Sequence, residues 1–190
     1  MARKPSNLKD VYQIKVTLLG SKPAIWRRML LPSDFSLEEL HWVIQAAMPW
    51  TNSHLHQFYD KNRTFYSDPK FNLEDVEDEA RTKLSDLLAR PKDRIVYEYD
   101  FGDGWEHGIE LEKILPREPK QKLPICVAGK RAAPPEDCGG IWGYADMLAI
   151  LKNPKHEEYE DRLEWVGGKW DPAAFDSARF EREARRLGLR

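Results

Sequence analysis

Apolar and polar residues alternate along the first part of the chain, a pattern typical of β-strands with one buried face. In VYQIKVTLLG, residues 11–20, every second side chain is apolar, and Gln13, Lys15 and Thr17 fall between them. Because successive side chains of a strand point to opposite faces, this alternation predicts a half-buried strand. A GSKP turn follows, and AIWRRMLL after it predicts the returning strand of a hairpin.

The hydrophobic spacing changes to that of a helix after Pro32. Ser36 and Glu39 form a capping-box signature, and apolar residues then recur at helical spacing until Pro49. The strings SHLHQFYD and RTFYS predict two further strands, and TKLSDLLAR predicts a short amphipathic helix. We expect the acidic stretch 74–79 between them to be a solvated loop.

A second hairpin is the clearest element of the sequence. In VYEYDFGDGWEHGIELEKI, residues 96–114, Tyr97, Tyr99 and Phe101 share one face of the first strand. The GDG string supplies the residues that a tight turn with positive φ requires. The pattern therefore predicts a hairpin with an aromatic face packed into the core.

Prolines and glycines dominate residues 115–141 and exclude long regular elements there. Three helices are predicted after them, in GYADMLAILKNP, HEEYEDRLEWVG and DPAAFDSARFEREARRLGLR, the last with Pro172 near its first turn. Strands first and helices last predict an α+β fold, in which antiparallel β-hairpins form a sheet packed with helices and extra helices lie at the C-terminus. We expect residues 1–10 to be a tail and residues 11–190 to be a single domain.

Composition narrows the class of protein. Thirty basic against 32 acidic residues give a net charge of −2, which argues against a surface built throughout to bind nucleic acid. Cys126 and Cys138 are too few for a disulfide framework and lack zinc-site spacing, which favours reduced thiols. No apolar run approaches the roughly 18 residues of a membrane span, and the first ten residues lack a signal peptide's apolar segment. We expect a cytoplasmic protein with no membrane association.

Two groups of polar side chains are candidates for chemistry around the strands. Asp100, Asp103 and His107 flank the GDG turn. They either bond to the local backbone, or bind a divalent cation or act in acid–base chemistry. His54 and His56 lie two apart on a predicted strand and so project from one face. They either present two imidazoles to one metal ion, or one caps the preceding loop while the other packs.

The string PPEDCGG, residues 134–140, is the most unusual local feature. Its acidic side chains either cap backbone amides or join the cysteine in offering oxygen and sulfur ligands, and a Cys nucleophile needs a His base nearby. The candidate polar site comprises Asp100, Asp103, His107, Glu136, Asp137 and Cys138. The candidate metal ligands are His54, His56, Asp103 and His107.

The last predicted helix has a basic side formed by Arg179, Arg182 and Arg186. Such a side either binds the phosphates of a nucleic acid or is solvated and paired with acids, here Glu181 and Glu183. No glycine-rich phosphate loop, dinucleotide fingerprint, serine elbow or zinc-finger spacing occurs in the sequence. Nucleotide use therefore has no support.

Five strings, taken in order, resemble one protein family: KPAIWRRMLLP, LEELHWVIQAAMPWTNSHLHQF, YEYDFGDGWEHGIELEKI, PICVAGKRAAPPEDCGGIWGY and DPAAFD. This is the plasmid pRiA4b third-open-reading-frame family, also described as insertion-element passenger or resolvase-like. The resemblance covers about residues 11–180 and implies a compact α+β domain with an antiparallel sheet, associated with mobile elements. Its motif residues fall on His54, His56, Asp100, Asp103, Trp105, His107, Glu136, Asp137, Gly139 and Gly140, and no established roles come with them.

The sequence leaves three functions open. The absence of a complete catalytic signature, with polar and aromatic groups on turns, favours a module that binds a protein or nucleic-acid partner. The alternative is a metal-dependent hydrolase, a class that includes nucleases. In it, one divalent ion lowers the pKa of bound water and is held by His54, His56, Asp103, His107 and the Glu136–Asp137 pair. DNA binding through the arginine side of the last helix ranks third. No cofactor is established beyond the metal that the second hypothesis implies.

Overall fold

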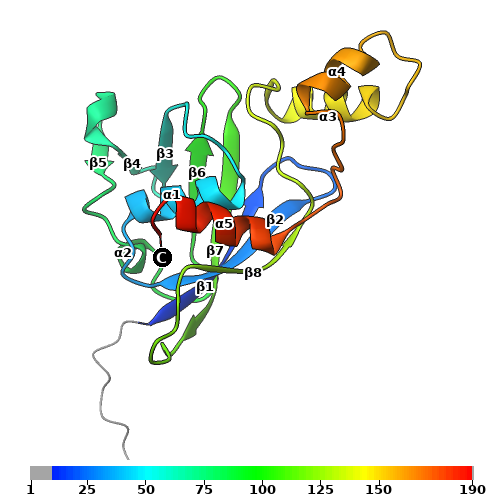
Figure 1. The fold of residues 1–190 in the computed structure, drawn as a ribbon. Coiled ribbons are helices and arrows are strands. Elements are labelled where there is room, and N and C mark those ends of the chain that lie inside the picture. The colour runs from blue at the N-terminus through cyan, green and yellow to red at the C-terminus, as the bar shows by residue number, and fades with distance from the viewer. Residues whose placement is uncertain (1–9, 190) are drawn as a thin grey trace, which may run out of the picture.

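The computed structural model describes residues 10–189 and is built around one mixed sheet (Figure 1). The strands are β1 (Val11–Leu18), β2 (Ile25–Pro32), β3 (His56–Tyr59), β4 (Phe65–Ser67), β5 (Val76–Asp78), β6 (Arg94–Tyr99), β7 (Trp105–Leu115) and β8 (Ile125–Lys130). Their order across the sheet is β5-β4-β3-β6-β7-β1-β2-β8. Neighbouring strands are antiparallel except β4 and β5, which run parallel.

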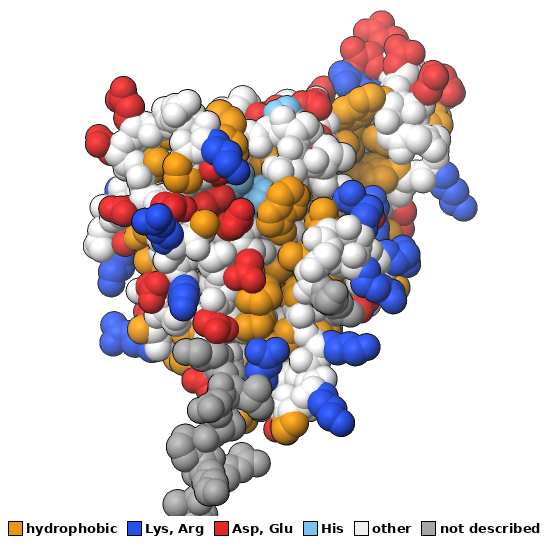
Figure 2. All heavy atoms as spheres, turned by 60° about the vertical axis from the view of Figure 1, so that its left-hand side comes forward, with side chains coloured by type: hydrophobic (Ala, Val, Ile, Leu, Met, Phe, Trp, Pro, Cys, Tyr) orange, Lys and Arg blue, Asp and Glu red, His pale blue; other side chains and the backbone are white. Residues whose placement is uncertain are grey.

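Helices cover one face of this sheet and extend from one of its corners. They are α1 (Leu37–Ala47), α2 (Leu84–Leu87), α3 (Gly140–Ile150), α4 (Tyr159–Trp165) and α5 (Ser177–Arg186), with a single 3-10 turn, η1 (Pro69–Phe71). In Figure 1, α1 and α5 lie in front of the sheet, and α3 with α4 projects at the upper right. Acidic side chains gather on this projection in Figure 2. The predicted α+β fold with helices at the C-terminus is confirmed.

The alternating pattern of the first strand places its apolar side chains in the core. Tyr12 is 5% exposed, and Ile14, Val16 and Leu18 are fully or almost fully buried. The helix α1 begins with the predicted capping box. Glu39 N donates to Ser36 Oγ, and Ser36 N donates to the Glu39 carboxylate. This exchange satisfies free amides at the helix start and typically stabilises a helix by about 1 kcal/mol.

The structure corrects two expectations around the acidic segment and the second hairpin. Residues 74–79 are not simply a solvated loop, because 76–78 form β5 beside β4 and Glu79 is only 2% exposed. Phe101 does not share the packed face of Tyr97 and Tyr99 but is 40% exposed. Asp100 has a positive φ of 57°, so the chain leaves the strand direction before it reaches Phe101.

Two boundaries also differ from those that the sequence predicts. Within the proline- and glycine-rich segment, residues 125–130 form β8, an edge strand that pairs with β2. The last helix begins at Ser177 with Asp176 as its N-cap, so Pro172 precedes the helix rather than occupying its first turn. Among the described residues, no helix has both the length and the apolar character needed to cross a membrane. The predicted tail lies outside the described residues except for Asp10.

Candidate metal centre

Three segments bring one imidazole and two carboxylates together at the end of the sheet. His54 precedes β3, Asp100 follows β6, and Asp137 belongs to the loop between β8 and α3. His54 Nδ1 lies 3.7 Å from Asp100 Oδ2, and His54 Nε2 lies 3.1 Å from Asp137 Oδ1. One ligand atom from each residue falls within 4.8 Å of the others. His54 Nε2 is buried and forms no hydrogen bond, although the Asp137 oxygen is close.

The turn of the second hairpin fixes the orientation of Asp100. Its Oδ1 accepts hydrogen bonds from the amides of Gly102, at 3.0 Å, and Asp103, at 3.3 Å. Its backbone amide donates to Leu55 O at 2.9 Å, which ties the hairpin to the segment that carries His54. The local role predicted for a turn aspartate therefore uses one carboxylate oxygen, and the other, Oδ2, faces the imidazole.

Hydrogen bonds from the neighbouring segments hold Glu136 and, with it, the loop that carries Asp137. Tyr99 OH donates to Glu136 Oε1 at 2.6 Å, and Thr51 donates to Oε2 through its amide, at 3.0 Å, and its hydroxyl, at 2.7 Å. Trp50 Nε1 donates to Pro134 O at 2.9 Å. With Glu136 occupied in this way, the adjacent Asp137 side chain is left 70% exposed beside His54.

The same loop also contacts the hairpin tip directly. Gly139 N donates to Asp103 Oδ2 at 3.2 Å, so Asp103 positions the loop. A Cβ atom at Gly140 would lie 2.3 Å from Asp103 O, and Gly140 has a φ of +65°. Only glycine combines this backbone conformation with such a close approach. The two glycines of PPEDCGG therefore have a definite structural role.

The site is strongly acidic. Within residues 10–189, none of Asp100, Asp103, Glu136 and Asp137 forms an ion pair with a lysine or arginine. Concentrated carboxylates without basic partners favour binding of a cation. Cys138 lies in the same loop, and burial, reinforced by Asp103, raises the pKa of its thiol to about 12. A raised pKa disfavours the thiolate that a cysteine nucleophile requires.

His56 belongs to a separate buried cluster. Its ring stacks on that of His41, and its Nε2 lies 3.0 Å from Glu79 Oε2. His41 Nδ1 in turn lies 2.8 Å from Tyr97 OH. All four side chains are at most 3% exposed. His54 and His56 therefore serve different surroundings, although they are only two residues apart.

His107 is also buried, beneath aromatic side chains rather than at the acidic cluster. Its ring contacts those of Trp50 and Tyr97, and its Nδ1 lies 3.0 Å from Trp105 O. Burial lowers the pKa of His107 to about 4, which keeps the imidazole neutral near neutral pH. The structure thus brings His54 together with Asp100 and Asp137, and places His56 and His107 elsewhere.

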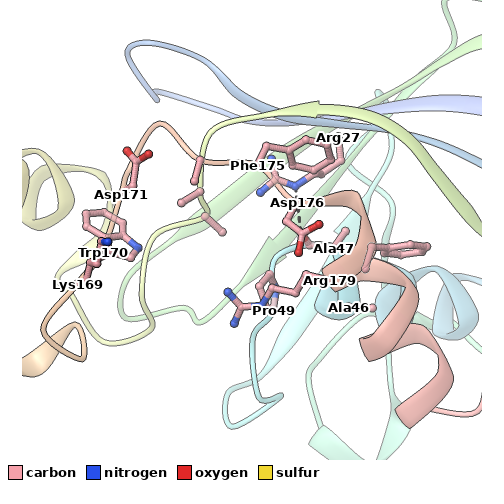
Figure 3. Close-up of a pocket in the computed structure, with 14 residues that line it drawn as sticks. Arg27, Ala46, Ala47, Pro49, Lys169, Trp170, Asp171, Phe175, Asp176 and Arg179 are labelled. Atoms are coloured by element: carbon pink, nitrogen blue, oxygen red, sulfur yellow. Dashed lines mark hydrogen bonds between the residues drawn. The ribbon is translucent and has the colours of Figure 1, made fainter.

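Two arginines of α5 pair with acids of the helix or of its N-cap. Arg182 pairs with Asp176 at 3.1 Å, and Arg186 pairs with Glu183 at 2.8 Å. Arg179 instead lines a pocket beside α5 (Figure 3). Exposed ion pairs of this kind contribute little stability, and the four arginines of the helix outnumber its two glutamates. Nucleic-acid binding by these arginines stays a prediction.

Sequence analysis predicts all three members of the cluster as candidates but not as one set. Spacing pairs His54 with His56, the hydrolase hypothesis adds Asp137 to these histidines, and Asp100 belongs only to the candidate polar site. Thr51 and Tyr99 are missed as residues that position the loop. The available signal was the acidic PPEDCGG string, whose carboxylates needed donors elsewhere in the chain.

Comparisons with known proteins identify the family of this chain. Residues 10–179 match the family described as plasmid pRiA4b ORF-3-like protein. The chain is 35% identical to the uncharacterized protein y4hQ of Sinorhizobium fredii (strain NBRC 101917 / NGR234), over 93% of this chain and 97% of that protein. A solved structure, the protein of unknown function MM3350 from Methanosarcina mazei Go1, is 41% identical with a TM-score of 0.82, over 90% of this chain and 98% of that one.

Proposed function

The chain belongs to the plasmid pRiA4b ORF-3-like family, and we propose that it is a metal-dependent hydrolase that binds one divalent ion through His54, Asp100 and Asp137. The supporting observation is the convergence of an imidazole and two carboxylates within 4.8 Å, at an acidic surface whose carboxylates pair with no lysine or arginine among residues 10–189. The three groups come from three separate segments, so the arrangement is not a by-product of one local turn.

The donor set indicates which ions the site would bind. One imidazole nitrogen and two carboxylate oxygens suit Mn²⁺, Fe²⁺ and Zn²⁺ better than Ca²⁺, which takes oxygen ligands alone. Three protein ligands are also typical of catalytic rather than structural zinc sites, because they leave a position for water. A bound divalent ion supplies hydroxide near neutral pH by lowering the pKa of that water.

The protein's own residues prepare this site for a substrate. The turn amides hold Asp100, so its free oxygen needs no rearrangement to bind an ion. The exposed Asp137 leaves the cluster accessible from solvent. Leu55 and Phe101, each 40% exposed, directly follow the ligands His54 and Asp100 in the chain. They offer apolar contacts to a substrate beside the reacting centre.

Isothermal titration calorimetry with Mn²⁺, Zn²⁺ and Mg²⁺ tests the binding part of this proposal. We expect one ion per chain, and at least tenfold weaker binding in Asp137→Asn and His54→Gln, because each removes one of three ligands. Asp146→Asn, which changes an exposed carboxylate on α3, is the matched control and should leave binding unchanged. No heat of binding with any of the three ions at millimolar concentration would overturn the proposal.

Turnover of model substrates tests the hydrolase part. The metal-loaded protein should hydrolyse either bis(p-nitrophenyl) phosphate or p-nitrophenyl acetate, and EDTA or Asp137→Asn should abolish the rate. Stoichiometric metal binding without turnover of either an ester or a phosphodiester would retain the metal site and reject the hydrolase.

An interaction module is the second candidate, and exposed aromatic side chains favour it. Trp142, on the first turn of α3, is 86% exposed, and Phe101 at the hairpin tip is 40% exposed. Large apolar side chains held at the surface are typical of sites that bind a partner. Fluorescence anisotropy with labelled single- and double-stranded oligonucleotides tests a nucleic-acid partner. Binding that is lost in Trp142→Ala would support it, and no binding at low salt would reject that class of partner.

A further inference from the structure

A pocket beside α5 has a buried arginine in its wall. Arg27, on β2, is only 3% exposed, and the pocket of about 200 Å³ is lined by this side chain, by α1 and by the segment that leads into α5 (Figure 3). Small side chains on that surface, among them Ala46, Ala47 and Ala133, leave the space open.

The Arg27 guanidinium is held in place but lacks a counter-charge. Its Nε donates to Ala47 O at 3.0 Å, and Nη1 donates to Trp26 O at 2.9 Å and Lys130 O at 3.1 Å. The second terminal nitrogen, Nη2, has no hydrogen-bond partner within residues 10–189, and no carboxylate in that range pairs with the group. Burial lowers the pKa of Arg27 to about 10, so it is still a cation at neutral pH.

A buried cation without an anionic partner is costly, which makes this arrangement informative. Carbonyl oxygens satisfy some of its donors but supply no net charge. The rim adds two cations, Lys169 and Arg179. Of the two rim acids, Asp176 already pairs with Arg182 and caps α5, and Asp171 accepts from Ala173 N. The pocket therefore presents positive charge to a ligand.

The remaining walls are aromatic and apolar. The Phe175 ring lies 4.9 Å from the Arg27 guanidinium, and in Figure 3 the two side chains lie together on one side of the pocket, with Lys169 and Trp170 on the opposite side. Phe175 is held there by its close approach to Gly129, where a Cβ would lie 2.5 Å from the ring. The volume is below the roughly 300 Å³ typical of sites for drug-sized ligands.

We infer that this pocket binds a small aromatic carboxylate, with the carboxylate on Arg27 Nη2 and the ring between Phe175 and Trp170. A guanidinium with an unused donor recognises a carboxylate by a charge-assisted hydrogen bond, and aromatic walls bury the ring. The inference is independent of the proposed metal centre, because none of the three metal-ligand candidates lines this pocket.

Ligand-observed NMR and calorimetry with phenylacetate and indole-3-acetate test the inference. All titrations contain EDTA, so that a carboxylate cannot bind through a metal ion. We expect saturable binding with a Kd of about 1 mM or tighter. The neutral amides of the same acids should bind at least tenfold more weakly, because they cannot neutralise the guanidinium.

Variants separate this site from nonspecific binding. Ala133→Leu fills the pocket, and Arg27→Gln removes the cation; both should abolish phenylacetate binding. Arg28→Gln is the matched control, because Arg28 is the next residue of β2 and pairs instead with Glu112 at 2.6 Å. Circular dichroism identifies any variant that is unfolded. If Arg27→Gln does not fold, Ala133→Leu still tests the inference.

Three outcomes would overturn the inference. They are the absence of binding to the folded wild-type protein at 10 mM ligand, equal affinity for acid and amide, and unchanged affinity in a folded Ala133→Leu variant. A fourth such outcome is binding of inorganic phosphate with at least the affinity of phenylacetate, since the pocket would then be a general anion site.

Discussion

The imidazole rings of His41 and His56 lie stacked in the core, with 3.6 Å between their centroids and 10° between their planes. One ring comes from α1 and the other from β3. Tyr97 approaches His41, and Glu79 approaches His56, so the stack joins the helix to the sheet through polar contacts. Burial, followed by the proximity of His56, lowers the pKa of His41 to about 2.

Acid should therefore destabilise the protein well above the pH at which carboxylates titrate. The pKa of His41, about 2, and of His107, about 4, lie below the ordinary histidine value of 6.5. Between pH 6.5 and the lowered pKa of each histidine, the unfolded chain binds more protons than the folded one. Stability is therefore full above about pH 6.5 and falls as the pH decreases below that value. Each histidine contributes a slope of roughly 1.4 kcal/mol per pH unit. Urea unfolding at pH 7.0, 6.0 and 5.0 measures this decrease in the free energy of unfolding.

The variant His41→Gln gives the matching test of the slope. It should flatten the decrease between pH 6.0 and 5.0 by about half, because one of the two histidines with a lowered pKa is removed. His156→Gln, in the loop before α4, should leave the slope unchanged. A stability that does not vary between pH 7.0 and 5.0 would contradict both assignments.

Gly104, at the hairpin tip, and Gly140, at the start of α3, form a matched pair for testing how the loop docks. Gly140 and Gly104 have similar positive φ angles, +65° and +63°, but only Gly140 faces a backbone oxygen, at 2.3 Å from an added Cβ. Gly104→Ala should cost about 1 kcal/mol from the backbone conformation alone. Gly140→Ala should cost clearly more and also weaken metal binding, because the loop carrying Asp137 must move. Thermal unfolding and the metal titration measure both effects.

The Tyr99 hydroxyl should matter for the site as well as for stability. It donates to Glu136 Oε1 and accepts from Ser53 N. We expect Tyr99→Phe to lower the free energy of unfolding by about 1.5–3 kcal/mol, the range for a bond to a charged group. Because Glu136 positions Asp137, metal affinity should fall too. In Tyr59→Phe, which removes a bond to Glu106 away from the site, metal affinity should not change.

Gly129 should control the shape of the arginine pocket. In Gly129→Ala the new methyl group would lie 2.5 Å from the Phe175 ring, so the ring must leave its place over Arg27. We expect a loss of about 1–3 kcal/mol in stability, as for other overpacked sites. Phenylacetate binding should weaken in parallel, while metal binding stays as in the wild type. A crystal structure of the variant with Phe175 unmoved would contradict this account.

Most of the helices and strands can be predicted from the sequence, because each depends on interactions within one segment. Alternation in β1 predicted its buried face, the pair Ser36 and Glu39 predicted the start of α1, and the GDG string predicted the hairpin turn. Local rules failed where pairing with a distant segment decided the structure. The acidic residues of β5 became a strand because β4 lies beside them, and β8 formed in a proline-rich segment because β2 offers an edge.

Which polar residues meet depends on how distant segments pack together. Spacing grouped His54 with His56, but β3 begins at His56, which turns into the core toward His41, whereas His54 precedes the strand and faces Asp100 and Asp137. Asp137 lies more than 80 residues from His54 in the chain, and hydrogen bonds from Tyr99 and Thr51 to Glu136 bring it there. Contacts between such distant segments depend on how strands are ordered in the sheet, and no periodicity within one segment encodes that order.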